Sequence, residues 1–281
     1  MLKPLLKIIS LICVCFVGHV NLVQANLLVS PTRLAFNDRE RSQELVLINT
    51  DSKVRTYRLH WVEKVALSTG GYKELTAQEA MTHPMASKMI RFSPKQVTLK
   101  PNERQVVRLA LRRPKGLLEG EYRSHLKLEA LPPKKEADKN KGEMSIKLDV
   151  LLSYSIPVLV RQGNVSHNIE ASGIELAFDP ATAKTQLRVN FIRSGLFSST
   201  GNVTAYWTAP DGNEHVVARL NNLNIYPELK TTSQQMSWID DSFRPEQGQL
   251  RIVYEGKQEF NGQIFAEYEY SVTPGMFKTS F

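Results

Sequence analysis

The sequence contains very little cysteine. Its two cysteines, Cys13 and Cys15, both lie within the first 25 of 281 residues. That segment has the pattern of a secretory signal peptide, with basic residues at Lys3 and Lys7, an apolar run over 5–17 and small residues near the expected cleavage point. Without this segment the chain has no cysteine. Disulfides are then excluded, and stability must come from hydrophobic cores alone.

Long hydrophobic runs are also missing after residue 25. A membrane-spanning helix needs roughly 20 consecutive apolar residues, so we expect no membrane insertion. The sequence predicts an exported, soluble chain that begins near Asn26. Its length is sufficient for one large domain or for two domains of ordinary size.

Motifs for catalysis, metal binding and nucleic-acid recognition are absent as well. The five histidines after residue 25 are far apart, and the sequence has no Gly-x-Ser-x-Gly motif and no glycine-rich phosphate loop. Basic residues exceed acidic ones by eight and are spread along the chain, which suits an acidic or carboxylate-bearing partner better than nucleic acid. We therefore expect no enzymatic activity, no cofactor and no metal.

Long helical periodicity is missing, and the chain alternates polar and apolar residues with a period of two instead. Short runs rich in β-branched and aromatic residues, such as 44–48, 55–62 and 105–111, are separated by turn residues. This pattern predicts an all-β sandwich or barrel. The one helical candidate, 76–81, spans about a single turn, and we expect it to be a loop.

The segment 122–130 shows the alternation clearly. Its even positions are apolar or small and its odd positions are polar, so it should bury one face and expose the other, with His125 pointing outward. Tyr122 at its start suits the tyrosine corner of an immunoglobulin-like sandwich. Trp61 suits the buried tryptophan of such a fold.

A charged stretch over 132–145 interrupts the strand pattern and predicts a solvated loop. One more strand, 146–156, follows it, and a second series of strands begins after Pro157. We therefore predict a first domain over 26–157 and a second domain over 158–281.

The last strand of the predicted first domain has a continuous apolar face. Its members are Ile146, Leu148, Val150, Leu152, Tyr154 and Ile156. Last strands are often edge strands, and a long apolar edge strand invites pairing with another chain. Two interpretations stay open: these side chains fill the first domain's own core, or some of them complete a partner's sheet. Four of them buried in a partner would contribute on the order of 6–12 kcal/mol before association costs.

A series of short motifs runs through the chain in a set order: Val-Ser-Pro-Thr-Arg-Leu-Ala-Phe at 29–36, Asn49, Trp61, Arg-Phe-Ser-Pro at 91–94, Leu-Lys-Pro at 99–101, Gly-Glu-Tyr-Arg-Ser-His-Leu at 120–126, Tyr-Ser-Ile-Pro-Val at 154–158, Arg-Ser-Gly at 193–195 and Gly-Asn-Val at 201–203. Together they resemble the PapD-like pilus assembly chaperones of the chaperone–usher pathway. The motifs at 91–94 and 154–158 look most similar to the archaic branch of that family.

This resemblance implies two immunoglobulin-like β-sandwich domains in a boomerang arrangement, located in the periplasm. It also implies a function: the chaperone binds pilus subunits by donor-strand complementation through the last strand of its first domain. The six apolar residues of 146–156 would be the donor residues. The subunit would then be delivered to an outer-membrane usher.

The family also uses basic residues between the domains to bind the subunit's C-terminal carboxylate, a strong charge-assisted contact. Arg33 matches the family's first-strand arginine. The family's lysine late in the last strand has no counterpart here, because 153–156 reads Ser-Tyr-Ser-Ile. Arg91 is our leading candidate for the second anchor, with Arg123 and Arg161 as weaker candidates.

Two alternative functions remain at this stage. A pilus structural subunit or adhesin should have a free N-terminal donor extension and usually one domain, whereas this chain enters a predicted strand at Leu27. A periplasmic hydrolase on a sandwich scaffold would need titratable groups that converge in a pocket.

Overall fold

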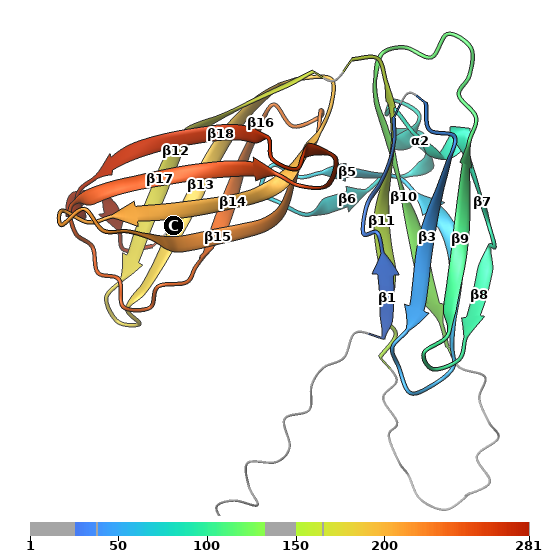
Figure 1. Cartoon of the computed structure of the whole chain (residues 1–281), viewed down its shortest axis with the longest axis horizontal. Helices are drawn as coiled ribbons and strands as arrows, with labels where there is room; N and C mark the ends of the chain where they lie inside the picture. Colours follow the sequence, from blue (N-terminus) through green and yellow to red (C-terminus); the bar gives the residue numbers. More distant parts are fainter. Residues whose placement is uncertain (1–25, 38, 133–149, 165, 281) are drawn as a thin grey trace, which may run out of the picture.

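The computed structural model of the chain describes residues 26–280, except for 38, 133–149 and 165. Almost all regular structure in these residues is β-strand, arranged in two bodies that meet at a steep angle (Figure 1). The helical elements are short. They are α2 (Ala77–Ala80) and the 3-10 turns η1 (Ser87–Met89), η2 (Gln258–Phe260) and η3 (Pro274–Met276). The prediction of an all-β protein with two sandwich domains is therefore confirmed.

The first domain packs two sheets face to face. The four-stranded sheet has the order β1 (Leu27–Ser30), β3 (Ser42–Asn49), β9 (Arg104–Leu111) and β7 (Ile90–Ser93). The five-stranded sheet has the order β2 (Leu34–Phe36), β11 (Tyr154–Gln162), β10 (Gly120–Leu131), β4 (Arg55–Val62) and β8 (Gln96–Leu99). Alternation sets which face is buried: Leu45 and Leu47 of β3, and Val107 and Leu109 of β9, have no exposed surface.

The second domain forms its sandwich from one curled sheet. Its strands are β12 (His167–Asp179), β13 (Lys184–Gly195), β14 (Ser199–Thr208), β15 (Glu214–Ile225), β16 (Thr231–Trp238), β17 (Gly248–Gly256), β18 (Ile264–Val272) and β19 (Phe277–Lys278). β16 makes the corner, because it pairs with β13 at Met236 and with β15 at Ser237 and Trp238. The core encloses large aromatic side chains, among them Trp207 and Phe191.

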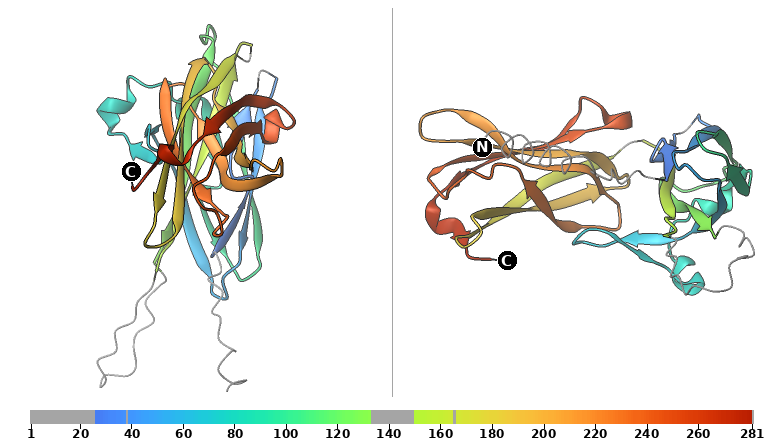
Figure 2. Two further views of the ribbon diagram at one scale, coloured as in Figure 1. Left: turned by 90° about the vertical axis from the view of Figure 1, so that its left-hand side faces the viewer. Right: turned by 90° about the horizontal axis from the view of Figure 1, so that it is seen from below.

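A two-stranded hairpin leaves the first domain and reaches the second. It consists of β5 (Lys64–Ala66) and β6 (Tyr72–Glu74), and Figure 2 shows it extending beneath the second domain. Its turn uses Gly70 and Gly71 at φ +96° and +80°, a left-handed conformation that favours glycine. The Ser68 carbonyl accepts hydrogen bonds from Ser233 N at 2.9 Å and from Thr232 Oγ1 at 2.7 Å.

Two expectations about local structure differ from what is found. The segment expected to be a loop contains α2, because Thr76 and Glu79 form a capping box that satisfies the first backbone N–H groups. The strand expected to end at 156 continues through Pro157 to Gln162 as β11, and all of it pairs with β10. Residues 158–162 therefore belong to the first domain's sheet.

The side-chain positions predicted for Tyr122, Trp61 and His125 have different outcomes. Tyr122 forms the tyrosine corner, since its hydroxyl donates to the Leu118 carbonyl at 3.1 Å. Trp61 is only partly buried and packs edge-on against Phe92 at 5.4 Å between ring centroids. The outward position predicted for His125 is wrong: its side chain is buried, because Tyr72 of the hairpin covers it at 5.0 Å between ring centroids.

Candidate functional site

The free edge of β11 is the first element of the candidate site. β11 lies between β10 and β2, but the short β2 pairs only with Val158, Leu159 and Val160. Among the described residues, the part of β11 over 154–157 therefore has no strand on that side. Unpaired main-chain groups along such an edge can accept a further strand.

The residues directly before β11 expose apolar side chains. Val150 is 60% exposed and Leu152 is 45% exposed, and Leu151 between them is exposed as well. Over 150–153 the chain is in no strand, and Ser153 Oγ accepts a hydrogen bond from Ala130 N at 3.2 Å. Exposed neighbouring apolar side chains of this size are typical of an interaction site.

The six predicted donor residues thus differ in their exposure to solvent. Val150 and Leu152 face solvent, whereas Ile156 is 4% exposed and packs in the first domain's own core. Tyr154 is half-buried against that core. The other two, Ile146 and Leu148, lie outside the described residues. The interpretation as core residues therefore holds for Ile156 and Tyr154, whereas completion of a partner's sheet stays a prediction for Val150 and Leu152.

A buried ionic cluster where the domains meet is the second element. We call its members, Arg33, Glu121, Arg161, Ser198 and Glu259, the junction cluster. Arg33 forms an ion pair with Glu259, and its Nη2 donates to Ser198 Oγ at 3.1 Å. Arg161 donates from Nε to Glu121 at 3.0 Å and from Nη1 to Glu259 at 2.9 Å. The cluster joins β10, β11 and the residue before β2 in the first domain to η2 and the residue before β14 in the second.

Electrostatics hold Glu259 and Arg33 of the junction cluster in their charged forms. Burial alone would raise the pKa of Glu259, but the charges of Arg33 and Arg161 outweigh it and keep the pKa below its usual value. Burial would lower the pKa of Arg33, yet Glu259 and Glu121 together raise it. Glu259 therefore faces the Arg33 guanidinium as a carboxylate at neutral pH.

A second ion pair crosses the junction beside the hairpin. Arg123 of β10 pairs with Glu228 in the loop between β15 and β16, and its Nη2 donates to the Lys64 carbonyl at 3.0 Å. Its guanidinium also stacks on Tyr226, 3.6 Å from the ring centroid. Glu228 in turn accepts a hydrogen bond from Ala66 N at 3.0 Å. Arg123 is thus held on several sides.

Of the predicted arginine anchors, three lie at the domain junction: Arg33, Arg123 and Arg161. Arg91 does not join them. It is exposed on β7, the edge strand of the other sheet, opposite Ala110 of β9. No contact links it to the junction cluster among the described residues, and its role as an anchor stays a prediction.

Sequence reasoning missed the acidic members of the junction cluster. Glu121 faces Arg161 directly in the register of β10 and β11, so a cross-strand pairing of these two segments could have identified it. Glu259 is 226 residues away from Arg33 in sequence and comes from the other domain. No local sequence pattern around Glu259 indicates that it pairs with Arg33.

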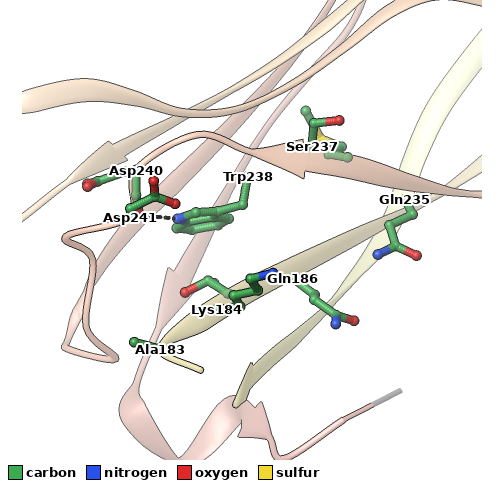
Figure 3. Close-up of a pocket in the computed structure, with 10 residues that line it drawn as sticks. Ala183, Lys184, Gln186, Gln235, Ser237, Trp238, Asp240 and Asp241 are labelled. Carbon is green, nitrogen blue, oxygen red and sulfur yellow. Dashed lines mark hydrogen bonds between the residues drawn. The ribbon is translucent and has the colours of Figure 1, made fainter. Parts of the chain in front are cut away.

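A separate cavity lies in the second domain where β13 and β16 diverge (Figure 3). It has a volume of about 440 Å³ and is lined mainly by polar side chains, including Lys184, Gln186 and Asp241. Trp238 borders it and donates from Nε1 to the Asp240 carbonyl at 3.0 Å. Within the described ranges, no three His, Cys, Asp or Glu residues gather as a metal site would require.

No helix in the described part of the chain is long and apolar enough to cross a membrane.

Comparison with known proteins gives a family. The family model described as "Pili and flagellar-assembly chaperone, PapD N-terminal domain" matches residues 26–165. Comparison with curated protein sequences returned no match. Among solved structures, the CupB2 chaperone of Pseudomonas aeruginosa is 13% identical, covering 88% of this chain and 99% of its own, with a TM-score of 0.45. A chain of CsuC–CsuE, a chaperone–tip adhesion subunit complex of Acinetobacter baumannii, is 15% identical. The match covers 87% of this chain and 98% of that one, with a TM-score of 0.44. The chain belongs to the family of PapD-like pilus assembly chaperones.

Proposed function

We propose that this chain is a periplasmic chaperone that captures pilus subunits by donor-strand complementation and delivers them to an outer-membrane usher. The observation that carries the proposal is the exposure of Val150 and Leu152 directly before the unpaired edge of β11. Membership of an assembly-chaperone family supports the same reading, and it favours a chaperone over the alternatives of a structural subunit or a hydrolase.

The physical basis is the addition of one strand to an incomplete sheet. A subunit strand laid along 150–157 would gain main-chain hydrogen bonds from the free edge, which set its register. Val150 and Leu152 would enter the subunit's core, and each would contribute roughly 1.5–3 kcal/mol. The subunit in turn would cover apolar surface that the free chaperone leaves in water.

Aspartate at both positions tests this proposal. Val150→Asp with Leu152→Asp places two charges where an apolar groove is expected, and subunit affinity should fall by at least about 100-fold. The assay co-expresses the chaperone with a pilus subunit from the same gene cluster and measures the amount of subunit that survives proteolysis.

Met81→Asp is the matched control, because Met81 is also an exposed apolar residue but lies at the end of α2, away from β11. It should leave the subunit yield unchanged. Equal subunit yields from the double aspartate variant and the control would contradict donor-strand capture.

A further inference from the structure

The strongest unexplained feature of the junction cluster is that its arginines already have carboxylate partners. What we infer from this pairing rests on the proposed function, in which a subunit's C-terminal carboxylate binds near Arg33. In the structure Arg33 already has a carboxylate partner, because it pairs with Glu259 and also donates to Ser198, while its buried Nε has no hydrogen-bond partner. Any carboxylate that arrives from a subunit must therefore compete with one that the chaperone supplies itself.

The two carboxylates of the cluster differ in how deeply they lie. Glu121 is almost fully buried, and its Oε2 accepts hydrogen bonds from Arg161 Nε, from Ser198 N and from Ser198 Oγ. Glu259 lies on the short turn η2, and its side chain is 21% exposed, compared with 4% for Arg33. Glu259 is thus the carboxylate on the solvent side of the cluster. It can leave for water, whereas Glu121 cannot do so without disrupting the core.

We propose that Glu259 is an internal substitute for the subunit's terminal carboxylate, which fills the site in the free chaperone and is displaced when a subunit is captured.

Charge balance favours displacement over addition. Two guanidinium groups and two carboxylates are balanced in the present cluster. A third carboxylate would have no guanidinium of the cluster left to pair with directly in a largely dehydrated site, which is unfavourable. Exchange of Glu259 for the incoming carboxylate keeps the balance, and the released side chain regains its hydration.

The position of the cluster along β11 fits this role. Arg161 lies nine residues after Leu152, and at ~3.3 Å per residue that separation is about 30 Å. A subunit segment whose terminal carboxylate binds at Arg33 and Arg161 could therefore also reach the free edge over 154–157, beyond the stretch of β11 that β2 occupies. Glu259 also joins the two domains, so its release would couple subunit capture to the contact between them.

The pair of Arg123 and Glu228 provides a matched control. It also joins an arginine of the first domain to a glutamate of the second. Glu228, however, is additionally bonded to Ala66 N, and Arg123 is stacked on Tyr226. Removing charge at Glu228 changes the net charge as much as removing it at Glu259, but leaves the junction cluster intact.

The first experiment uses acetate as the probe, with acetamide as its neutral isostere. Glu259→Ala vacates the carboxylate position, and NMR of the ¹⁵N-labelled guanidinium groups follows Arg33 and Arg161. Acetate should shift both signals saturably in this variant, while acetamide should not, and neither probe should do so in the wild type. Absence of a saturable acetate shift in Glu259→Ala, or an identical shift in the wild type, would overturn the proposal.

The second experiment measures capture of a pilus subunit co-expressed from the same gene cluster. Glu259→Gln keeps the size of the side chain but removes the competing charge, so the subunit should bind about tenfold more tightly. Glu228→Gln should bind it as the wild type does. A subunit extended by two C-terminal glycines, which displace its carboxylate, should show no gain from Glu259→Gln. Unchanged or weaker capture of the native subunit by Glu259→Gln would contradict the proposal.

The two proposals can fail separately. If the aspartates at 150 and 152 abolish capture while Glu259→Gln changes nothing, donor-strand capture stands and the role of Glu259 is wrong. If the aspartates leave capture intact, the proposed function itself fails.

Discussion

At the scale of single residues, His125 is where the two-residue alternation of the sequence fails. Ser124, Leu126 and Leu128 of β10 are buried as the alternation predicts. His125 is buried too, because the β5–β6 hairpin covers the face that would otherwise meet water. Burial, with smaller effects of Arg123 and Lys64, lowers the pKa of His125 to about 3.

This shift predicts a loss of stability in acid. The unfolded chain takes up a proton at His125 near pH 6.5, whereas the folded chain does so only near pH 3. Acidification therefore favours unfolding between these values, and His125 alone should make the protein about 2 kcal/mol less stable at pH 5 than at pH 7. His125→Phe should remove this part of the pH dependence in denaturant titrations. An equally steep loss in that variant would show that other groups cause it.

At the scale of elements, the β5–β6 hairpin is the clearest bridge between the domains. Besides the two bonds accepted by Ser68, the Tyr72 hydroxyl lies 3.1 Å from that of Tyr226. At about 0.5–1.5 kcal/mol for each bond, these contacts contribute roughly 2–4 kcal/mol to the closed junction.

Replacing 67–72 by two glycines should therefore loosen the angle between the domains without unfolding either one. Small-angle X-ray scattering should show a broader range of intramolecular distances than in the wild type. A scattering curve identical to that of the wild type would mean that the ionic pairs alone fix the angle.

At the scale of the whole molecule, the charged residues are divided unequally between the two domains. Residues 26–162 contain 25 Lys and Arg against 15 Asp and Glu, whereas 163–281 contain 9 against 13. In the three ion pairs that cross the junction among the described residues, the arginine comes from the first domain and the glutamate from the second. The basic first domain also suits a partner that offers a carboxylate.

Much of this architecture could be predicted from the sequence. Alternation and turn residues gave the strands and the two sandwiches, because strand burial has a local period. The contacts between domains could not be predicted, since Glu259 and the hairpin act on residues far away in sequence. The same limit explains the error at His125, which is buried by a segment some 50 positions earlier in the chain.

Hydrogen–deuterium exchange over 150–157 tests the central claim most directly. In the free chaperone the amides of 150–153 should exchange rapidly, because this segment is in no strand. In complex with a pilus subunit, these amides and those of the free edge of β11 should become protected, since a strand added there pairs with them. Rapid exchange over 150–153 in the complex, with protection confined to other surfaces, would contradict capture by strand donation.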